Sequence, residues 1–518
     1  MANSKHPTMR LPWQKRDRPP RGRKRKSEII ETTTELQPLQ PTPSESEPAP
    51  APISKVPTGL GAEPVNIVIL GASFAGLSVA HHFLDETIDR LRITRVAPNY
   101  RLVIISPSTH VYWNIGAPRA LVGPDLLKNK DIFIPIEPGF HRHRGHNFTI
   151  IQGEAVSLDP SARVVNVELI GSTAHMRVSQ INKRSSKVLT PNAILSNKIQ
   201  PIRYHALVMA TGTYTHSDLL SLHGPHLNTM GALNQFHAQA AEARSIVVGG
   251  GGCSGVETAG QLATYLNYKS HWPLKKRIKL PKKIIVISGG DRVLPTFPQK
   301  VSLQAEKMLN RLGVEVKHGV RVIAVKEGFD LTGQTKIEFN DETTMIADMY
   351  VPCTGVIPNT DYLPAEMKTA KGFVAMNPKT MRVDHPLAGA RTYSIGDVAS
   401  YSQNWVIDVY AAIPTLMHNL LNDLLAHEYH LASPYGGNQE KIDDLKDRAF
   451  IQPPIDSQLC PITRFGGAGT ILGHKVPTWF VHTSKGHDYK VGKAKTVVVN
   501  GGSPYIAKEG KAPKGTKK

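Results

Sequence analysis

Two stretches of the chain share the same order of apolar and polar positions: a short apolar run, a cluster of glycines, and a longer segment with helical periodicity. The first, residues 65–84, reads VNIVILGASFAGLSVAHHFL, and the second, residues 245–265, reads SIVVGGGGCSGVETAGQLATY. A short, continuously apolar run is typical of a parallel strand that is buried on both faces. The pattern therefore predicts a strand, a tight turn and a helix in direct succession at both places.

Further apolar runs predict the elements that complete two α/β units. The expected strands lie at 101–105, 150–167 (a strand pair), 206–213, 283–288, 314–325, 336–339, 349–352 and 393–395, and a helix is expected at 300–312. A polar stretch, 172–200, predicts a long hairpin or a loose loop. No run of about twenty apolar residues occurs, so we expect no membrane-spanning segment.

The first glycine turn, GASFAG at 71–76, has the chemistry of a dinucleotide site. Gly71 allows the turn and Gly76 lets helix and strand approach, so that N–H groups at the helix start can face a pyrophosphate. Ser73 stands where a second glycine is usual. A glycine turn that only packs a helix on a sheet is the alternative reading of such a motif.

The second turn fits G-x-G-x-x-G through Gly250, Gly252 and Gly255, between a predicted strand and a predicted helix. Neither unit has an acidic residue at the end of its second strand, where a carboxylate would hold a ribose hydroxyl. Ser106 and Ser288 stand there instead. With Arg292 close to the second of these positions, either NADH or NADPH is compatible with the sequence.

Several residues beyond the turns are candidates for cofactor contact. Trp113, Asn114 and Arg119 follow the second strand and could reach a flavin or the phosphates. Two later strands end in small residues that would let the backbone pack on a bound cofactor, Thr211-Gly212 and Cys353-Thr354-Gly355.

The net charge of +20 is concentrated in residues 1–60, 269–283 and 485–518. The rest of the chain is close to neutral, which argues against a globular nucleic-acid-binding face. Residues 1–62 combine a basic run with a proline-rich stretch, and we expect a disordered tail. The basic run could be a nuclear address, a contact with acidic lipid, part of a mitochondrial presequence, or a solvated tail.

The three cysteines, Cys253, Cys353 and Cys460, form no C-x-x-C pair. This spacing predicts neither a disulfide scaffold nor a redox-active dithiol, and it favours an intracellular, reducing compartment. We expect Cys253 and Cys353 to be structural. The 22 histidines show no spacing typical of a metal site, so no metal is expected.

The order of five motifs carries a resemblance to a known family. Glycine turn, Ala-Thr-Gly, second glycine turn, Cys-Thr-Gly and Gly-Asp (396–397) follow one another across residues 71–397, and the segments WNIGAPR and SKGHDYKVGK match as well. In this the chain resembles the flavoproteins with two dinucleotide-binding domains. It looks like the apoptosis-inducing-factor-like, ferroptosis-suppressor type and is similar to type II NADH:quinone dehydrogenases.

The resemblance implies an α/β fold with two Rossmann-like domains, one for FAD and one for NADH or NADPH, and a smaller C-terminal α+β region. It implies catalytic roles for Glu257, near the nicotinamide and the flavin, and for Lys485. The cofactor-binding positions that we expect are Gly71, Ala72, Ser73, Ala75, Gly76, Arg119, Ala155 (a backbone contact to adenine), Thr211, Gly212, Gly250, Gly252, Gly255, Gly355, Gly396 and Asp397, the last on the ribityl chain.

The expected domains follow from the same motif order. They are the tail 1–62, an FAD-binding domain in two parts (63–230 and 359–430), an NAD(P)-binding domain (231–358) and a C-terminal region with a basic tail (431–518).

The expected function is an FAD-dependent enzyme that passes electrons from NAD(P)H to a quinone or a similar small acceptor. A flavoenzyme of a specialised biosynthetic pathway, and a non-enzymatic, nucleic-acid-binding flavoprotein like the apoptosis factors, are the alternatives. We expect a cytoplasmic protein, or one in peripheral contact with an anionic membrane, with mitochondrion and nucleus as further locations.

Overall fold

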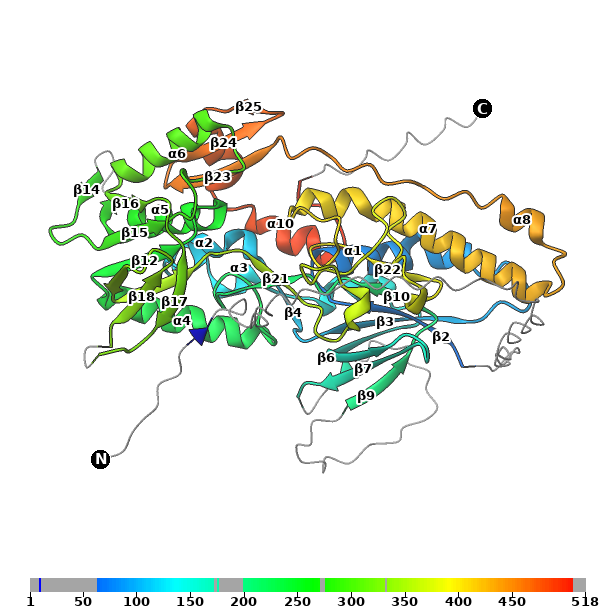
Figure 1. Cartoon of the computed structure of the whole chain (residues 1–518). Coiled ribbons are helices and arrows are strands. Elements are labelled where there is room, and N and C mark those ends of the chain that lie inside the picture. The colour runs from blue at the N-terminus through cyan, green and yellow to red at the C-terminus, as the bar shows by residue number, and fades with distance from the viewer. Residues whose placement is uncertain are drawn as a thin grey trace, which may run out of the picture.

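The computed structural model describes residues 9–10, 63–171, 175–176, 199–270, 275–330 and 333–505. These residues form two α/β units side by side, and a small three-stranded sheet lies against the second unit (Figure 1). The predicted fold class is confirmed, because both units contain a parallel sheet flanked by helices.

The first unit is built on a sheet whose central strands are parallel. Its order is β22 (Thr392–Ser394), β10 (Ala206–Met209), β2 (Val65–Leu70), β3 (Tyr100–Ser106), β6 (Phe148–Asp159), β7 (Val164–Leu169) and β9 (Ile199–Arg203), with β8 (His175–Met176) also paired to β6. Strands β7, β8 and β9 are antiparallel to their neighbours. The central strands are buried on both faces, which explains their continuously apolar sequences.

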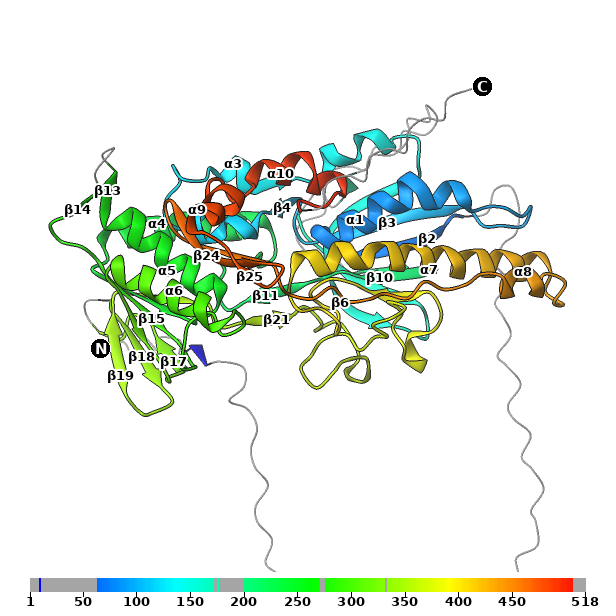
Figure 2. The same ribbon diagram turned by 90° about the horizontal axis from the view of Figure 1, so that it is seen from above.

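Helices cover one face of this sheet. Ile67 and Ile69 of β2 belong to the core beneath α1 (Phe74–His82) and α7 (Val406–Ala432), which pack against each other. Figure 2 shows α7 running alongside α1. On the opposite face, Val68 and Leu70 pack into a second core with residues of the 360–398 segment. The alternation along β2 therefore places a layer on each side of the sheet.

The second unit repeats this plan on a smaller scale. Its parallel sheet has the order β16 (Val314–Lys317), β15 (Lys283–Ile287), β12 (Ser245–Gly249) and β20 (Met349–Pro352), and α5 (Cys253–Leu266) and α6 (Gln299–Arg311) pack on it. An antiparallel sheet, β1 (Met9–Arg10), β17 (Val322–Lys326), β18 (Thr335–Phe339) and β19 (Thr344–Ala347), shares a third core with its other face.

The C-terminal segment returns to both units. The sheet β23 (Gln458–Thr463), β24 (Gly466–Ile471) and β25 (His474–Lys475) packs on α5 and α6, and α10 (Val491–Thr496) lies by the first unit. In Figure 1 this segment, orange to red, crosses from one unit to the other. It is therefore placed to contribute side chains at the junction.

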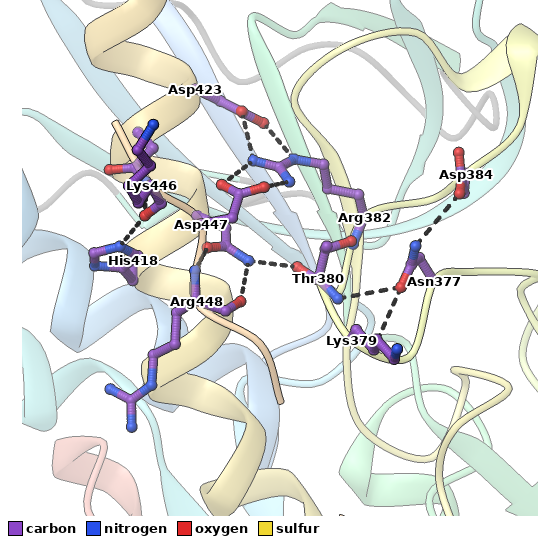
Figure 3. A network of polar contacts seen from close by, with 12 residues as sticks. Asn377, Lys379, Thr380, Arg382, Asp384, His418, Asp423, Lys446, Asp447 and Arg448 are labelled. Carbon is purple, nitrogen blue, oxygen red and sulfur yellow. Dashed lines mark hydrogen bonds and ion pairs between the residues drawn. The ribbon is translucent and has the colours of Figure 1, made fainter. Parts of the chain in front are cut away.

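An arginine fixes the chain that leads into this segment. Arg382 makes hydrogen bonds to both carboxylate oxygens of Asp423 on α7, at 3.0 and 2.7 Å, and it also pairs with Asp447 (Figure 3). Nearby, the side-chain amide of Asn419 donates to the carbonyl oxygen of Arg448 at 2.9 Å. These contacts hold residues 446–448 against α7.

Several expectations fall outside the described residues: most of the tail 1–62, most of the polar stretch 172–200, part of the basic segment 269–283, and residues 506–518. Among the described helices, none combines the length and apolar character that crossing a bilayer requires.

Candidate active site

Equivalent backbone hydrogen bonds anchor the two glycine turns. In the first unit the N–H of Gly71 donates to the carbonyl oxygen of Ile105, and in the second the N–H of Gly250 donates to that of Ile287, both at 2.8 Å. Each bond joins the start of the turn to the end of the next strand. The two turns therefore open at the carboxyl edges of their sheets, where α/β proteins bind ligands.

Glycine is required in these turns for close packing. Gly71 and Gly250 have φ values of +102° and +130°, which only glycine adopts easily. A Cβ atom on Gly76 would lie 1.9 Å from the carbonyl oxygen of Gly71, and one on Gly255 would lie 1.9 Å from that of Gly250. Gly252 is different, because no atom lies within 4 Å of its Cβ position. It faces open space that a ligand could use.

Ser73 occupies the place in the first turn that Gly252 has in the second. Each residue directly precedes its helix, and the Ser73 side chain is exposed. Ala72 and Ala75, the other expected contacts here, are buried. The N–H groups at the start of α1 could meet a pyrophosphate beside the Ser73 hydroxyl.

The strands next to the turns end at the same edges. Gly212 and Gly355 follow β10 and β20, both have positive φ, and both have open space at the Cβ position. The Thr211 hydroxyl donates to the carbonyl oxygen of Asn359 at 2.8 Å, so this side chain secures the link between the units. The small residues at these strand ends leave room for a cofactor.

The Gly-Asp turn lies against the first glycine turn. A Cβ atom on Gly396 would come within 3.1 Å of the Ala75 Cβ. The Asp397 carboxylate accepts a hydrogen bond from the Ser402 hydroxyl at 3.1 Å, and burial raises the pKa of this carboxyl. A largely buried carboxylate with one hydroxyl donor fits a ligand that supplies further hydroxyl groups.

Ala155 lies on β6, at an irregularity in its pairing with β7. Because Gln152 is the partner of Ser106 at the end of β3, Ala155 is three residues beyond that strand end.

The serines at the expected ribose positions hydrogen-bond to nearby backbone. The Ser106 hydroxyl donates to the carbonyl oxygen of Ser108 at 2.9 Å, and the Ser288 hydroxyl donates to that of Arg292 at 3.1 Å.

A buried ion pair joins the two catalytic candidates. The ammonium group of Lys485 lies 2.6 Å from Oε1 of Glu257, and the two side chains are only 16% and 3% exposed. The Cys253 thiol donates to the same oxygen at 3.3 Å. Burial raises the pKa of Glu257, and Lys485 and Cys253 oppose that rise. Glu257 raises the pKa of Lys485 against the effect of burial, so the ammonium form is favoured.

Arg119 links the first unit to this pair. Its Nε donates to the Gln261 side chain on α5 at 3.0 Å, one Nη donates to the carbonyl oxygen of His487 at 2.8 Å, and its guanidinium lies 4.6 Å from the centre of the Tyr489 ring. Its other Nη atom and the Tyr489 hydroxyl are buried without a partner among the described residues. Such orphaned groups fit a site that a polar cofactor completes.

One sequence expectation at this junction is wrong. Trp113 does not face a ligand site, because its side chain is fully buried and its Nε1 donates to the carbonyl oxygen of Tyr489 at 2.8 Å. It holds the C-terminal segment instead.

The spacing of the cysteines in the sequence did not indicate that two of them lie close together in the fold. Cys253 and Cys460 are both free thiols, but their sulfur atoms and a Glu257 oxygen all lie within 4.8 Å of one another. The separation of 207 positions between the two cysteines concealed this proximity from any spacing rule. The positively charged Lys485 ammonium lies against the Glu257 carboxylate and would repel a metal cation at this place.

A second group of potential metal ligands in the described residues is His81, Asp85 and His143. Its two histidines hydrogen-bond each other at 2.8 Å.

A separate cavity of about 940 Å³ lies between β11 (Thr213–Thr215), α4 (His226–Glu242), β17 and β20. Glu257, Lys485 and the glycine turns do not line it. No motif in the sequence indicated this cavity.

The family model described as pyridine nucleotide-disulphide oxidoreductase matches residues 65–415. The chain is 31% identical over 430 residues to "Oxidoreductase phnG" of Penicillium herquei, covering 82% of this chain and 93% of the relative. It is 24% identical over 261 residues to the type II NADH:quinone oxidoreductase NdhA of Mycobacterium tuberculosis, covering 50% of each chain. Among solved structures, the sulfide:quinone oxidoreductase of Aquifex aeolicus shares the fold, with a TM-score of 0.57 at 14% identity over 85% of this chain and 92% of that one.

Proposed function

The chain belongs to the pyridine nucleotide-disulphide oxidoreductase family and is a pyridine nucleotide-dependent oxidoreductase, and on that premise we propose that it uses FAD to pass electrons from NADH or NADPH to a quinone or a similar small acceptor. One observation carries this proposal. Two glycine turns with the same hydrogen bonding open at two sheet edges, and the Glu257–Lys485 pair lies where the units meet.

The first unit would hold FAD. The N–H groups that follow Gly71 would bind the pyrophosphate at the start of α1, and Asp397 would accept hydrogen bonds from the ribityl hydroxyls. One buried Nη atom of Arg119 has no partner among the described residues and could donate to an acceptor oxygen of FAD. When bound, FAD accepts the hydride of the nicotinamide and passes the electrons on to the acceptor.

The second unit would hold the nicotinamide nucleotide. Gly252 leaves space for its phosphates at the start of α5, and Glu257 lies one turn further along the helix. Among the described residues, the side chains of Lys485 and Cys253 both donate to Oε1. The other oxygen, Oε2, is then the one that would accept a hydrogen bond from the carboxamide or ribose and orient the ring.

The end of β15 favours NADPH over NADH. Ser288, and not an acidic residue, follows the last residue of β15, and the exposed Asp291 lies further along the loop. The position of a Gly289 Cβ lies 2.9 Å from Cγ and 3.1 Å from Nε of Arg321. Arg292 is half-buried in the loop that follows. Two guanidinium groups near this strand end would attract a 2′-phosphate more strongly than an uncharged 2′-hydroxyl.

Support for a quinone acceptor comes from relatives, among them the NADH:quinone oxidoreductase named above. We also propose that the chain is of the apoptosis-inducing-factor-like, ferroptosis-suppressor type within this family. A further part of the proposal is peripheral contact with an anionic membrane through basic segments such as 269–283.

The visible spectrum of the purified protein tests this function. A flavin band is expected, which NADPH or NADH removes under anaerobic conditions and a soluble quinone restores. A protein that takes up no FAD on incubation would overturn the proposal. A flavin band that neither nucleotide changes would favour the non-enzymatic alternative.

A further inference from the structure

Cys253 and Cys460 bring two free thiols from distant parts of the chain to one place. Cys253 is the first residue of α5 and is partly exposed, whereas Cys460 is on β23 and is fully buried. The sulfur of Cys460 lies 3.8 Å from the carbonyl oxygen of Cys253. Their sulfur atoms are within 4.8 Å, and a disulfide requires about 2.05 Å.

Close packing of the two backbones keeps the thiols together. A Cβ atom on Gly260 of α5 would lie 2.3 Å from the carbonyl oxygen of Ile462 on β23, and the side-chain amide of Gln261 donates to the same oxygen at 3.4 Å. The helix and the strand are therefore in direct contact two turns after Cys253. A bond between them requires the two sulfur atoms to move closer, by rotation of the side chains and a shift of β23.

We propose that Cys253 and Cys460 are a redox-modification site, in which a hydroperoxide converts the two thiols to a reversible disulfide. The hydroperoxide oxidises the partly exposed Cys253 thiol to a sulfenic acid and is itself reduced to an alcohol or, from hydrogen peroxide, to water. The Cys460 sulfur then attacks the Cys253 sulfur. The sulfenic hydroxyl leaves with the Cys460 proton as water, and the disulfide forms. A dithiol such as dithiothreitol reverses the oxidation.

The disulfide would change the neighbouring ion pair. The Cys253 thiol that donates to Oε1 of Glu257 no longer exists after oxidation. Leu459, next to Cys460, accepts a hydrogen bond from Lys485 through its carbonyl oxygen at 3.2 Å, so a shift of β23 reaches the other partner. The bond would thus reduce turnover, a consequence that rests on the proposed function, whereas the disulfide itself does not.

Peptide mapping of the oxidised holoprotein tests the proposal. The protein is treated with hydrogen peroxide, alkylated under denaturing conditions, digested without reductant and analysed by mass spectrometry. We expect one linked pair of peptides containing Cys253 and Cys460, absent after dithiothreitol. Cys353, which is also free, should be recovered alkylated. Recovery of both cysteines as thiols or as irreversible oxygen acids, or a bond to Cys353, would overturn the site.

Two variants separate the site from its effect on turnover. Cys460→Ala should lose the linked peptide, and after prolonged peroxide treatment dithiothreitol should no longer restore its activity, because Cys253 without a resolving thiol is oxidised further to irreversible oxygen acids. Cys353→Ala should form the linked peptide and recover with dithiothreitol as the wild type does. A linked peptide in wild-type protein without loss of NAD(P)H oxidation would overturn the coupling to Glu257. If the untreated protein oxidises neither nucleotide, the proposed function fails, and the peptide map still decides whether the disulfide forms.

Discussion

A Cβ atom on Gly255 would lie 1.9 Å from the carbonyl oxygen of Gly250, because the first turn of α5 packs directly on the glycine turn before it. Gly252, in the same turn, has no neighbour within 4 Å of its Cβ position. Gly255 is therefore required by the fold, whereas Gly252 is available to a ligand.

Alanine at each of these positions should separate stability from binding. We predict that Gly255→Ala lowers the free energy of unfolding by about 1–3 kcal/mol, because the methyl group must displace backbone. Gly252→Ala should cost about 1 kcal/mol or less as a change of helix cap, yet raise the KM for the nicotinamide nucleotide. Thermal unfolding and steady-state kinetics measure the two effects. Equal losses of stability would contradict this division.

The sequence predicted these turns because their glycine requirement is local. The strand β15 and the helix α6 were also recognised within a residue of their observed ends. The long helix α7 was missed, since Pro414 and buried polar residues such as Asp408 and Asn419 interrupt its apolar pattern. Tertiary contacts stabilise it instead.

The candidate site was predictable only in part. Glu257 follows a recognisable turn, but Lys485 was indicated by family resemblance alone, because it lies 228 residues further along the chain. The proximity of Cys460 to Cys253 and the orphaned Nη atom of Arg119 gave no signal in the sequence at all. Such relationships are set by how the C-terminal segment folds back between the units, and no periodicity encodes them.

Asp397 should affect cofactor retention and not stability. We predict that Asp397→Asn purifies with less FAD, because the amide is a weaker acceptor for ribityl hydroxyls. The apoprotein should melt no lower than wild type, since burial already disfavours the carboxylate and raises its pKa. The ratio of flavin to protein absorbance gives the FAD content. Full FAD retention by Asp397→Asn would exclude the proposed contact.

Arg321 should set the choice of nucleotide. We predict that Arg321→Glu lowers the ratio of kcat/KM for NADPH over NADH by about tenfold or more, because a cation near the 2′-phosphate becomes an anion. Lys283→Glu makes the same charge change at the opposite end of β15 and should leave this ratio unchanged. A wild-type ratio in the Arg321 variant would show that this strand end does not read the 2′ position.

The ion pairs of Arg382 with Asp423 and Asp447, shown in Figure 3, predict that the stability of the protein depends on pH. Hydrogen bonding to Arg382 lowers the pKa of Asp447 below 3.8. Its stabilisation is therefore fully present above pH 3.8, the value for the unfolded chain, and is lost as the pH falls through the lower folded value.

Asp447→Asn should thus lower the melting temperature at pH 6 and have a smaller effect near pH 2.5. Arg382→Gln should lower the free energy of unfolding at pH 6 by about 2 kcal/mol, because it leaves two partly buried carboxylates without their partner. This value is smaller than that for a fully buried pair, because the carboxylates are partly exposed. An Asp447→Asn effect that is independent of pH would contradict this account.

The central claim is that Glu257 orients the nicotinamide for hydride transfer. Stopped-flow mixing of the FAD-loaded protein with NADPH under anaerobic conditions measures this step directly. We predict that Glu257→Gln keeps its FAD, because its contacts are with α5 and the C-terminal segment. Its flavin should be reduced on the order of 100-fold more slowly than in wild type. Glu306→Gln, which alters a carboxylate paired with His318 on the surface of α6, is the control and should react at the wild-type rate. Reduction of the Glu257→Gln flavin at the wild-type rate would contradict the account.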